Sequence, residues 1–208
     1  MIKVGLNIGN SKISCAVIEI KDNANVNLLS FDSYPSKILK KNIITNFELL
    51  TNEIKVLIHE SEKKSQTKIN SINLNIPTVD SISKYYDSEI DNLNNEITKL
   101  DIRKAINKSE YFNVSEDYFE IFNNIYGYVL DNNLIFNSPL GNYANKLKIL
   151  FYKILIPYKT FNSYKNIIEK LNIKIDNFVP TPLSSSLAVL SNDEKMIGSI
   201  CIDLGHSN

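Results

Sequence analysis

Short apolar segments separated by turn-forming residues open the chain. Residues 2–8, 13–21 and 26–32 are rich in Ile, Val and Leu, and Gly, Asn, Asp and Ser stand between them. Runs of this length and composition predict three strands. Because the connections are too short for a crossover, we expect the three strands to pair as an antiparallel meander.

A helical pattern follows and then gives way to another strand pattern. Over residues 46–64 apolar side chains recur at the spacing of one helix face, with Lys and Glu on the opposite face. Residues 71–77 form a short apolar run that Pro77 ends. The N-terminal part of the chain therefore has the predicted order βββαβ. The inward helix face is expected to comprise Leu49, Leu50, Ile54, Leu57 and Ile58.

The middle of the chain changes character at residues 81–97, which are polar and poorly periodic. A helix is predicted from Thr98, because Asp101 follows three residues later in a near capping-box pattern. Two long strands, 118–133 and 146–157, are predicted next, joined by a loop that contains the turn NSPLGN. This part reads as a small inserted α+β unit. Its helix is expected to face inward through Ile102, Ala105 and Ile106.

Aromatic residues gather on the two predicted long strands. Packing in the core is the first interpretation of such a cluster, and a surface that binds a partner is the alternative. The cluster comprises Tyr118, Phe119, Phe122, Tyr126, Tyr128, Phe151 and Tyr152.

The C-terminal quarter alternates between helix and strand. Residues 160–173 have a helical period, 175–180 predict a strand, 182–191 predict a helix with Pro182 in its first turn, and 197–205 predict a final strand. This order is typical of one half of an α/β sheet. The predicted helix is expected to be apolar on the side of Tyr164, Ile167, Ile168 and Leu171.

Charge and cysteine usage narrow the function classes. Acidic and basic residues balance at 23 each, so no long-range field gathers nucleic acid, and nucleic-acid binding is not expected. No apolar run approaches the about 20 residues of a membrane span, and the N-terminus lacks a signal-peptide pattern. We therefore expect a cytoplasmic protein. Cys15 and Cys201 lie in strand-like segments, which is typical of buried structural thiols.

Two strand-to-turn stretches carry the candidate chemistry. GLNIGNSK at residues 5–12 and CIDLGHSN at residues 201–208 both place a polar residue, an apolar residue and glycine after an apolar strand. Backbone amides of two such turns on adjacent strands can hold a phosphate tail. For either stretch alone, an ordinary glycine turn is the alternative. Asn7 stands where a metal-dependent phosphate site would carry a carboxylate.

Taken together, these segments resemble the actin-like ATPase superfamily and, within it, the N-terminal portion of the FtsA family of bacterial cell-division proteins. GLNIGNSKISCAVIEI resembles the first phosphate loop and next strand, and NEITKLDIRKAI resembles the start of the helix in the inserted domain. The NSPLGN turn resembles the strand connection of that domain. NIIEKLNIKIDNFVPTPLSSSLAVLSNDEKMIGSICIDLG resembles the return to the core and the second phosphate loop.

The resemblance implies an α/β fold, with an actin-like (ribonuclease H-like) core subdomain of order βββαβα and a small inserted α+β module of the SHS2 type. Residues 1–79 would form the first part of subdomain 1A and 80–157 the inserted module, which is 1C-like. Residues 158–196 would return to subdomain 1A, and 197–208 would begin a truncated second core domain, 2A-like. We expect a fragment, a truncated reading frame or a degenerate relative.

The departures from the family pattern concern charge. The family's usual Asp is Asn7 here, its Glu is Thr181, and Gly-Gly-Thr-like residues are replaced by His206, Ser207 and Asn208. The lost carboxylates normally orient Mg²⁺ and its waters. We therefore expect weak ATP binding with Mg²⁺, hydrolysis that is absent or very slow, and no catalytic residue. The predicted nucleotide contacts are Asn7, Gly9, Asn10, Ser11, Lys12, Asp203, Gly205, His206 and Ser207, and the predicted metal ligand is Asp203.

The resemblance also implies a function. It is that of a scaffold which links the tubulin-like division ring to the inner membrane, recruits later division proteins and associates with itself into filaments. The expected location is the cytoplasmic face of the inner membrane at the division site, with membrane contact only through a C-terminal helix that this chain does not contain. The alternatives are an actin-like protein of type IV pilus assembly and an active ATPase or sugar-kinase-like enzyme of the superfamily.

Overall fold

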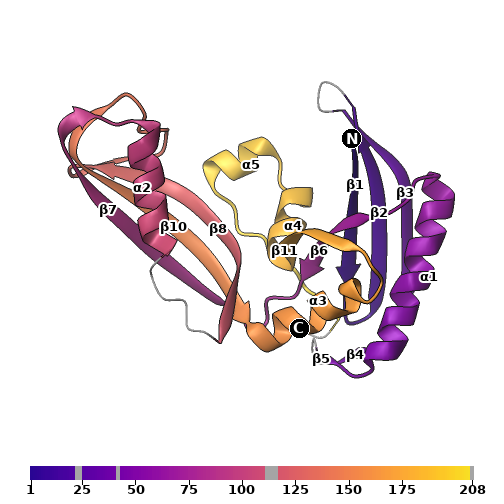
Figure 1. Cartoon of the computed structure of the whole chain (residues 1–208). Coiled ribbons are helices and arrows are strands. Elements are labelled where there is room, and N and C mark those ends of the chain that lie inside the picture. The colour runs from indigo at the N-terminus through magenta and orange to yellow at the C-terminus, as the bar shows by residue number, and fades with distance from the viewer. Residues whose placement is uncertain (22–24, 41–42, 111–116, 207–208) are drawn as a thin grey trace. The chain divides into compact units, whose positions relative to one another are not determined.

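The computed structural model describes residues 1–21, 25–40, 43–110 and 117–206. Within it the chain forms two compact units, Met1–Val79 with Lys159–Asn208, and Asp80–Tyr158. The first unit is built on a five-stranded mixed sheet and the second on a four-stranded antiparallel sheet (Figure 1).

The sheet of the first unit has the strand order β11-β6-β1-β2-β3. The first three strands pair antiparallel, which confirms the predicted meander. Strand β6 lies between β1 and β11 and runs parallel to both. The strands are β1 (Ile2–Ile8), β2 (Lys12–Ile20), β3 (Val26–Pro35), β6 (Ser71–Ile76) and β11 (Lys174–Pro180).

Helix α1 (Phe47–Ser65) packs against β2 and β3. It begins where the side chain of Asn46 accepts a hydrogen bond from the Leu49 amide at 2.9 Å, which satisfies one of the free donors of the first turn. The predicted inward residues Leu50, Ile54, Leu57 and Ile58 are buried. Leu49 was wrongly included, because it lies on the side of the helix and is 49% exposed.

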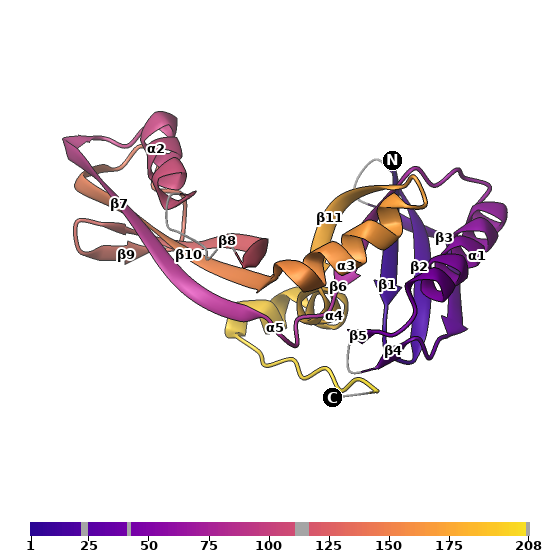
Figure 2. The same ribbon diagram turned by 60° about the horizontal axis from the view of Figure 1, so that its bottom comes forward.

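Three further helices and a small hairpin complete this unit. Phe161 of α3 stacks on Phe178 of β11 with ring centroids 4.7 Å apart, and α4 contacts β11 and β6 (Figure 2). No helix among the described residues is both long and apolar enough to cross a membrane. The elements are α3 (Tyr158–Glu169), α4 (Thr181–Val189), α5 (Asn192–Ile197), β4 (Leu39–Lys40) and β5 (Ile43–Ile44).

The two faces of the first sheet differ in polarity. One face is apolar and buried, as the alternation of strand side chains requires, and its central members are Leu6, Cys15 and Leu74. Cys15 is fully buried, which confirms the prediction for this cysteine, and burial raises the pKa of its thiol. The other face is polar and half-buried: Asn73 donates to the Val4 carbonyl oxygen at 3.2 Å and accepts from Asn177 at 2.8 Å.

A buried carboxylate joins β3 to the end of α1. Asp32 is 4% exposed and accepts hydrogen bonds from Ser61 Oγ, at 3.0 Å, and from Lys64 Nζ. The bond to Asp32 raises the pKa of the Lys64 ammonium. Because a buried charge is stable only when it is paired and hydrogen-bonded, Lys64 fixes the last turn of α1 over the edge strand.

The second unit pairs its strands in the order β7-β10-β8-β9, all antiparallel. Helix α2 (Lys99–Glu110) covers one face, with Ala105 buried and Ile102 and Ile106 packed against the same core, as predicted. Thr98 and Asp101 exchange hydrogen bonds in the expected capping pattern. The strands are β7 (Ile82–Glu96), β8 (Tyr118–Leu130), β9 (Asn133–Ile135) and β10 (Tyr143–Pro157).

Two strand assignments in this unit differ from the prediction. The segment that looked poorly periodic, residues 81–97, contains the long strand β7. Its alternation of apolar and polar side chains is hard to recognise in the sequence, because the open face carries charged residues. Asp87 and Glu89 on this face form ion pairs with Lys148. The predicted strand over 118–133 ends at Leu130, and the chain turns there to add the short strand β9.

The aromatic cluster divides between the two faces of this sheet. Phe151 is buried and Tyr128 packs against the core under α2. On the open face Tyr85, which the sequence did not single out, contacts Tyr126 and Tyr152 at centroid distances of 5.5 and 5.2 Å. Tyr85 is 72% exposed. Packing in the core is therefore confirmed for Phe151 and Tyr128, and partner binding by the residues of the open face stays a prediction.

The end of the chain departs most from the prediction. Residues 198–205 form no strand, and Cys201 is exposed rather than buried. The apolar residues of this segment, Ile200, Ile202 and Leu204, are at least 76% exposed, because the described residues offer them no neighbouring strand. Helix α5 was not predicted. Ser191 and Glu194 form a full capping box at its start, and the sequence SNDE has the pattern typical of that motif.

Replacing Lys64 by Met should destabilise the first unit by about 1–3 kcal/mol, because the Asp32 carboxylate stays buried with one donor fewer. Urea unfolding measures the change. The second substitution Asp32→Asn should recover most of the loss in the K64M background, since it removes the buried charge. Equal losses in K64M with and without Asp32→Asn would show that Lys64 does not act by pairing the Asp32 charge.

Replacing Thr98 by Ala should destabilise α2 by about 1 kcal/mol, which is typical of an N-cap. Hydrogen bonds from Thr98 lower the pKa of Asp101 below its ordinary value of 3.8. Their contribution is therefore present above that pH and is lost as the pH falls through the folded-state pKa. Hydrogen exchange of the α2 amides should show a difference from the parent chain that shrinks in acid. Thr51→Ala, in the second turn of α1, is the control that should show no such pH dependence.

Candidate nucleotide-binding site

The turn between β1 and β2 forms the first candidate phosphate loop. The Gly9 amide donates to the Lys12 carbonyl oxygen at 2.9 Å, and the Ser36 amide, just beyond β3, donates to the Ser11 carbonyl oxygen at 3.0 Å. A Cβ at Gly9 would lie 3.0 Å from the Lys12 carbonyl oxygen, so the close approach of the backbone favours glycine. The loop is thus held from within and from β3.

This turn lies at the edge where three parallel strands end. Strands β1, β6 and β11 point the same way and end at Ile8, Ile76 and Pro180. Helix α4 starts immediately after β11, and its first residue, Thr181, donates through Oγ1 to the Ile76 carbonyl oxygen at 3.1 Å. Ligands of open α/β sheets bind outside the carboxyl ends of the strands. The geometry therefore fits a ligand at this edge.

Asn7 and Thr181, which stand where the family pattern has acidic residues, both lie at this edge of the sheet. Asn7 is half-buried near the end of β1, between Ser14 of β2 and Asn75 of β6. Its Nδ2 lies 3.6 Å from the position that a Cβ at Gly9 would take, so the amide borders the loop. Thr181 directs its hydroxyl to the β6 backbone. Neither residue offers the anionic oxygen that Mg²⁺ prefers.

The second candidate phosphate loop differs from the first in that its described residues are all exposed. Asp203 accepts a hydrogen bond from Ser185 Oγ of α4 at 2.7 Å, and Asp203, Gly205 and His206 are exposed. Ser207 lies outside the described residues. Within the described ranges, no three His, Cys, Asp or Glu side chains gather as a metal site would require. The role of Asp203 as a metal ligand stays a prediction.

Sequence reasoning missed two contacts of this region. Ser185 was not singled out, although the run of three serines in PLSSSL offers hydroxyls next to the predicted loop. The bond from Thr181 to Ile76 spans 105 residues of sequence, and no local pattern reveals it. Contacts to nucleotide by Asn7, Gly9, Asn10, Ser11 and Lys12 likewise stay predictions.

The chain is similar to curated FtsA proteins over nearly its whole length. It is 26% identical over 200 residues to cell division protein FtsA of Neisseria meningitidis serogroup B, covering 96% of this chain and 48% of that protein. The identity to FtsA of Pseudomonas aeruginosa is 23%, over 97% of this chain and 48% of that protein, and to FtsA of Escherichia coli K12 it is 22% with the same coverage. No family model matches the chain.

A solved structure shares the fold. The chain superposes on the PilM-PilN type IV pilus biogenesis complex with a TM-score of 0.56 at 12% identity, covering 89% of this chain and 49% of that chain. The predicted actin-like α/β fold class is confirmed. The chain spans about half the length of the curated relatives it matches. The resemblance to the FtsA family read from the sequence is therefore confirmed, and it corresponds to an N-terminal portion of such a protein.

Proposed function

We propose that the chain is part of a cell-division scaffold of the FtsA type that binds nucleotide weakly and hydrolyses it very slowly or not at all. The observation that carries the cell-division part is the similarity to FtsA proteins over 96–97% of the chain. The neutral side chains of Asn7 and Thr181 at the sheet edge support the chemical part. The chain spans about half the length of its relatives. What the whole protein does is therefore part of this proposal as well.

The residues of the edge suit an anion better than a metal. The turn that Gly9 allows brings the backbone of residues 9–12 close together, and Lys12 is exposed at its end. An ammonium group and backbone amides can bind phosphate without a metal ion. ATP with Mg²⁺ would contact this loop and Asp203. When bound, Mg²⁺ would neutralise phosphate charge, but few carboxylates here would hold it.

The scaffold role rests on likeness to FtsA. In this proposal the chain contributes to linking the division ring to the inner membrane, to recruiting later division proteins and to filaments formed by self-association. The tubulin-like ring protein is the expected partner, and the cytoplasmic face of the membrane at the division site is the expected location. The open aromatic face around Tyr85 and Tyr126 supports a role in protein contacts.

The alternatives find less support. The likeness to the PilM-PilN complex, at 12% identity, concerns the fold and does not favour a pilus function. An active ATPase or sugar kinase would need acidic residues to hold Mg²⁺ at the sheet edge, where this chain has Asn7 and Thr181.

Replacing Gly9 by Ala should weaken ATP binding several-fold or more and lower the melting temperature, because the added Cβ meets the Lys12 carbonyl oxygen at 3.0 Å. Gly5→Ala is the matched control, since a Cβ there has no neighbour within 4 Å. Titration with a fluorescent ATP analogue and thermal unfolding measure the two effects. Equal ATP affinity in the two variants would show that the turn does not bind nucleotide.

The purified chain should release no phosphate from ATP above background with or without Mg²⁺, and its affinity for ATP should change little when Mg²⁺ is removed, because carboxylates are missing from positions 7 and 181. Phosphate release and isothermal titration provide the measurements. Asn7→Asp should increase the dependence of ATP binding on Mg²⁺. Hydrolysis that requires Mg²⁺ and is lost in Asp203→Asn would contradict the proposed absence of catalysis.

A further inference from the structure

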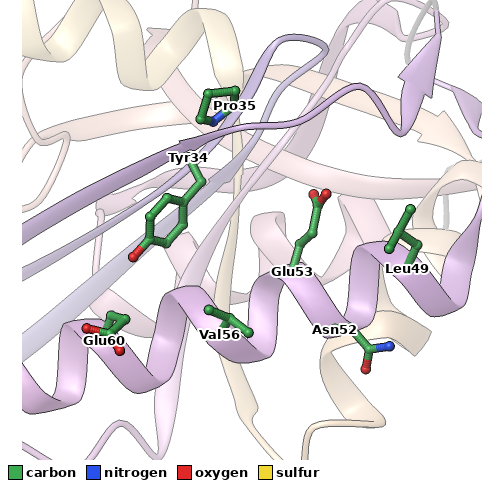
Figure 3. A pocket seen from close by; sticks show the side chains of 7 residues that line it. All are labelled: Tyr34, Pro35, Leu49, Asn52, Glu53, Val56 and Glu60. Carbon is green, nitrogen blue, oxygen red and sulfur yellow. The ribbon is translucent and has the colours of Figure 1, made fainter.

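A groove runs between helix α1 and the end of strand β3. Tyr34 and Pro35 form its strand side, and the helix side comprises residues on one stripe of α1, spaced at intervals of three, four and seven. Figure 3 shows the Glu53 and Leu49 side chains rising from the helix toward β3, while the Tyr34 ring descends toward the helix. We call it the α1–β3 groove. Its lining residues on α1 are Leu49, Asn52, Glu53, Val56 and Glu60.

The strand side of the groove is an open sheet edge. β3 is the last strand in the order β11-β6-β1-β2-β3, and no described strand pairs with its outer side. In an edge strand every second residue directs its amide and carbonyl away from the sheet, where they await another strand. β3 is 10 residues long, which is enough to pair with a short extended segment.

The helix side supplies apolar surface. Leu49 and Val56 are 49% and 57% exposed, although they lie beside the packed face of α1. A strand added next to β3 would lie beneath this stripe of the helix, and half of its side chains would point to it. Pairing of the backbone and burial of Leu49 and Val56 would therefore occur together.

The acidic side chains of the groove favour an occupant with a basic residue. Glu53 and Glu60 line it, and no Lys or Arg does. Oε2 of Glu53 is buried and has no hydrogen-bond partner among the described residues. A carboxylate that has lost part of its hydration without gaining a donor is stabilised by an incoming cation.

We propose that the α1–β3 groove binds an extended peptide segment of a partner protein, which adds a strand to β3 and places a Lys or Arg between apolar residues at Glu53. Backbone pairing would provide affinity and the alternate side chains specificity, as in other cases of strand addition. This site is separate from the candidate nucleotide loop and does not depend on the chain binding ATP.

A displayed library of random ten-residue peptides, selected on the 208-residue chain, tests the proposal. We expect enriched peptides to carry a basic residue flanked by apolar ones at alternate positions, and amide shifts on binding to centre on β3 and α1. Glu53→Gln should weaken a selected peptide by at least about tenfold, the effect of losing a charge-assisted hydrogen bond. Glu48→Gln, in the exposed first turn of the same helix, is the matched control and should leave affinity unchanged.

Other outcomes overturn the proposal. These are a selection that returns no binding peptide, peptides whose shifts lie elsewhere, or affinity that Glu53→Gln leaves intact. Proline is placed at each of two adjacent central positions of a selected peptide. It should abolish binding at the position whose amide faces β3, and tolerance of proline at both positions would exclude strand pairing. A chain that is dimeric before peptide is added, with the outward-facing β3 amides already protected from exchange, would show that a second copy occupies the groove.

Discussion

The parallel pairing of β6 with β1 and β11 is the constraint on which the rest of the first unit depends. It brings Ser71 beside Lys174, more than 100 residues later in the chain, and the inserted unit Asp80–Tyr158 lies between these two residues in the sequence. Ile72, Leu74 and Ile76 of β6 are fully buried, so this pairing is also the centre of the core. Without it the turn at Gly9 and the start of α4 would not share one edge.

The same strands set the chemical character of that edge. Their apolar sides hold the sheet to its helices, and their other sides present amides that bond to one another, as Asn73 does with Asn177. Such a face is polar. Asn7 fits it, because a neutral amide costs less to remove from water than a carboxylate, which would need a cation or several donors there to offset its desolvation.

Local patterns predicted those parts whose neighbours are close in sequence. The meander, the buried stripe of α1 and the Thr98 cap follow from alternation, helical period and short turns. Strand β7 was missed because one of its faces pairs charges instead of burying apolar groups. The predicted strand at residues 197–205 was wrong because alternation makes a strand only where another strand accepts it. At the candidate site, the glycine turn could be predicted from the sequence, but the hydrogen bond from Thr181 to Ile76 could not, because it joins residues far apart in the chain.

Strand β3 contributes to both proposed binding sites of this unit. Pro35 borders the α1–β3 groove, and the next residue, Ser36, donates to the Ser11 carbonyl oxygen and so helps to hold the candidate phosphate loop. Three residues before Pro35, Asp32 fixes the end of α1 through Ser61 and Lys64. One strand therefore positions the loop at its end and the helix above it. Because β3 is paired on one side only, its order depends on these polar contacts more than the order of β1 or β6 does.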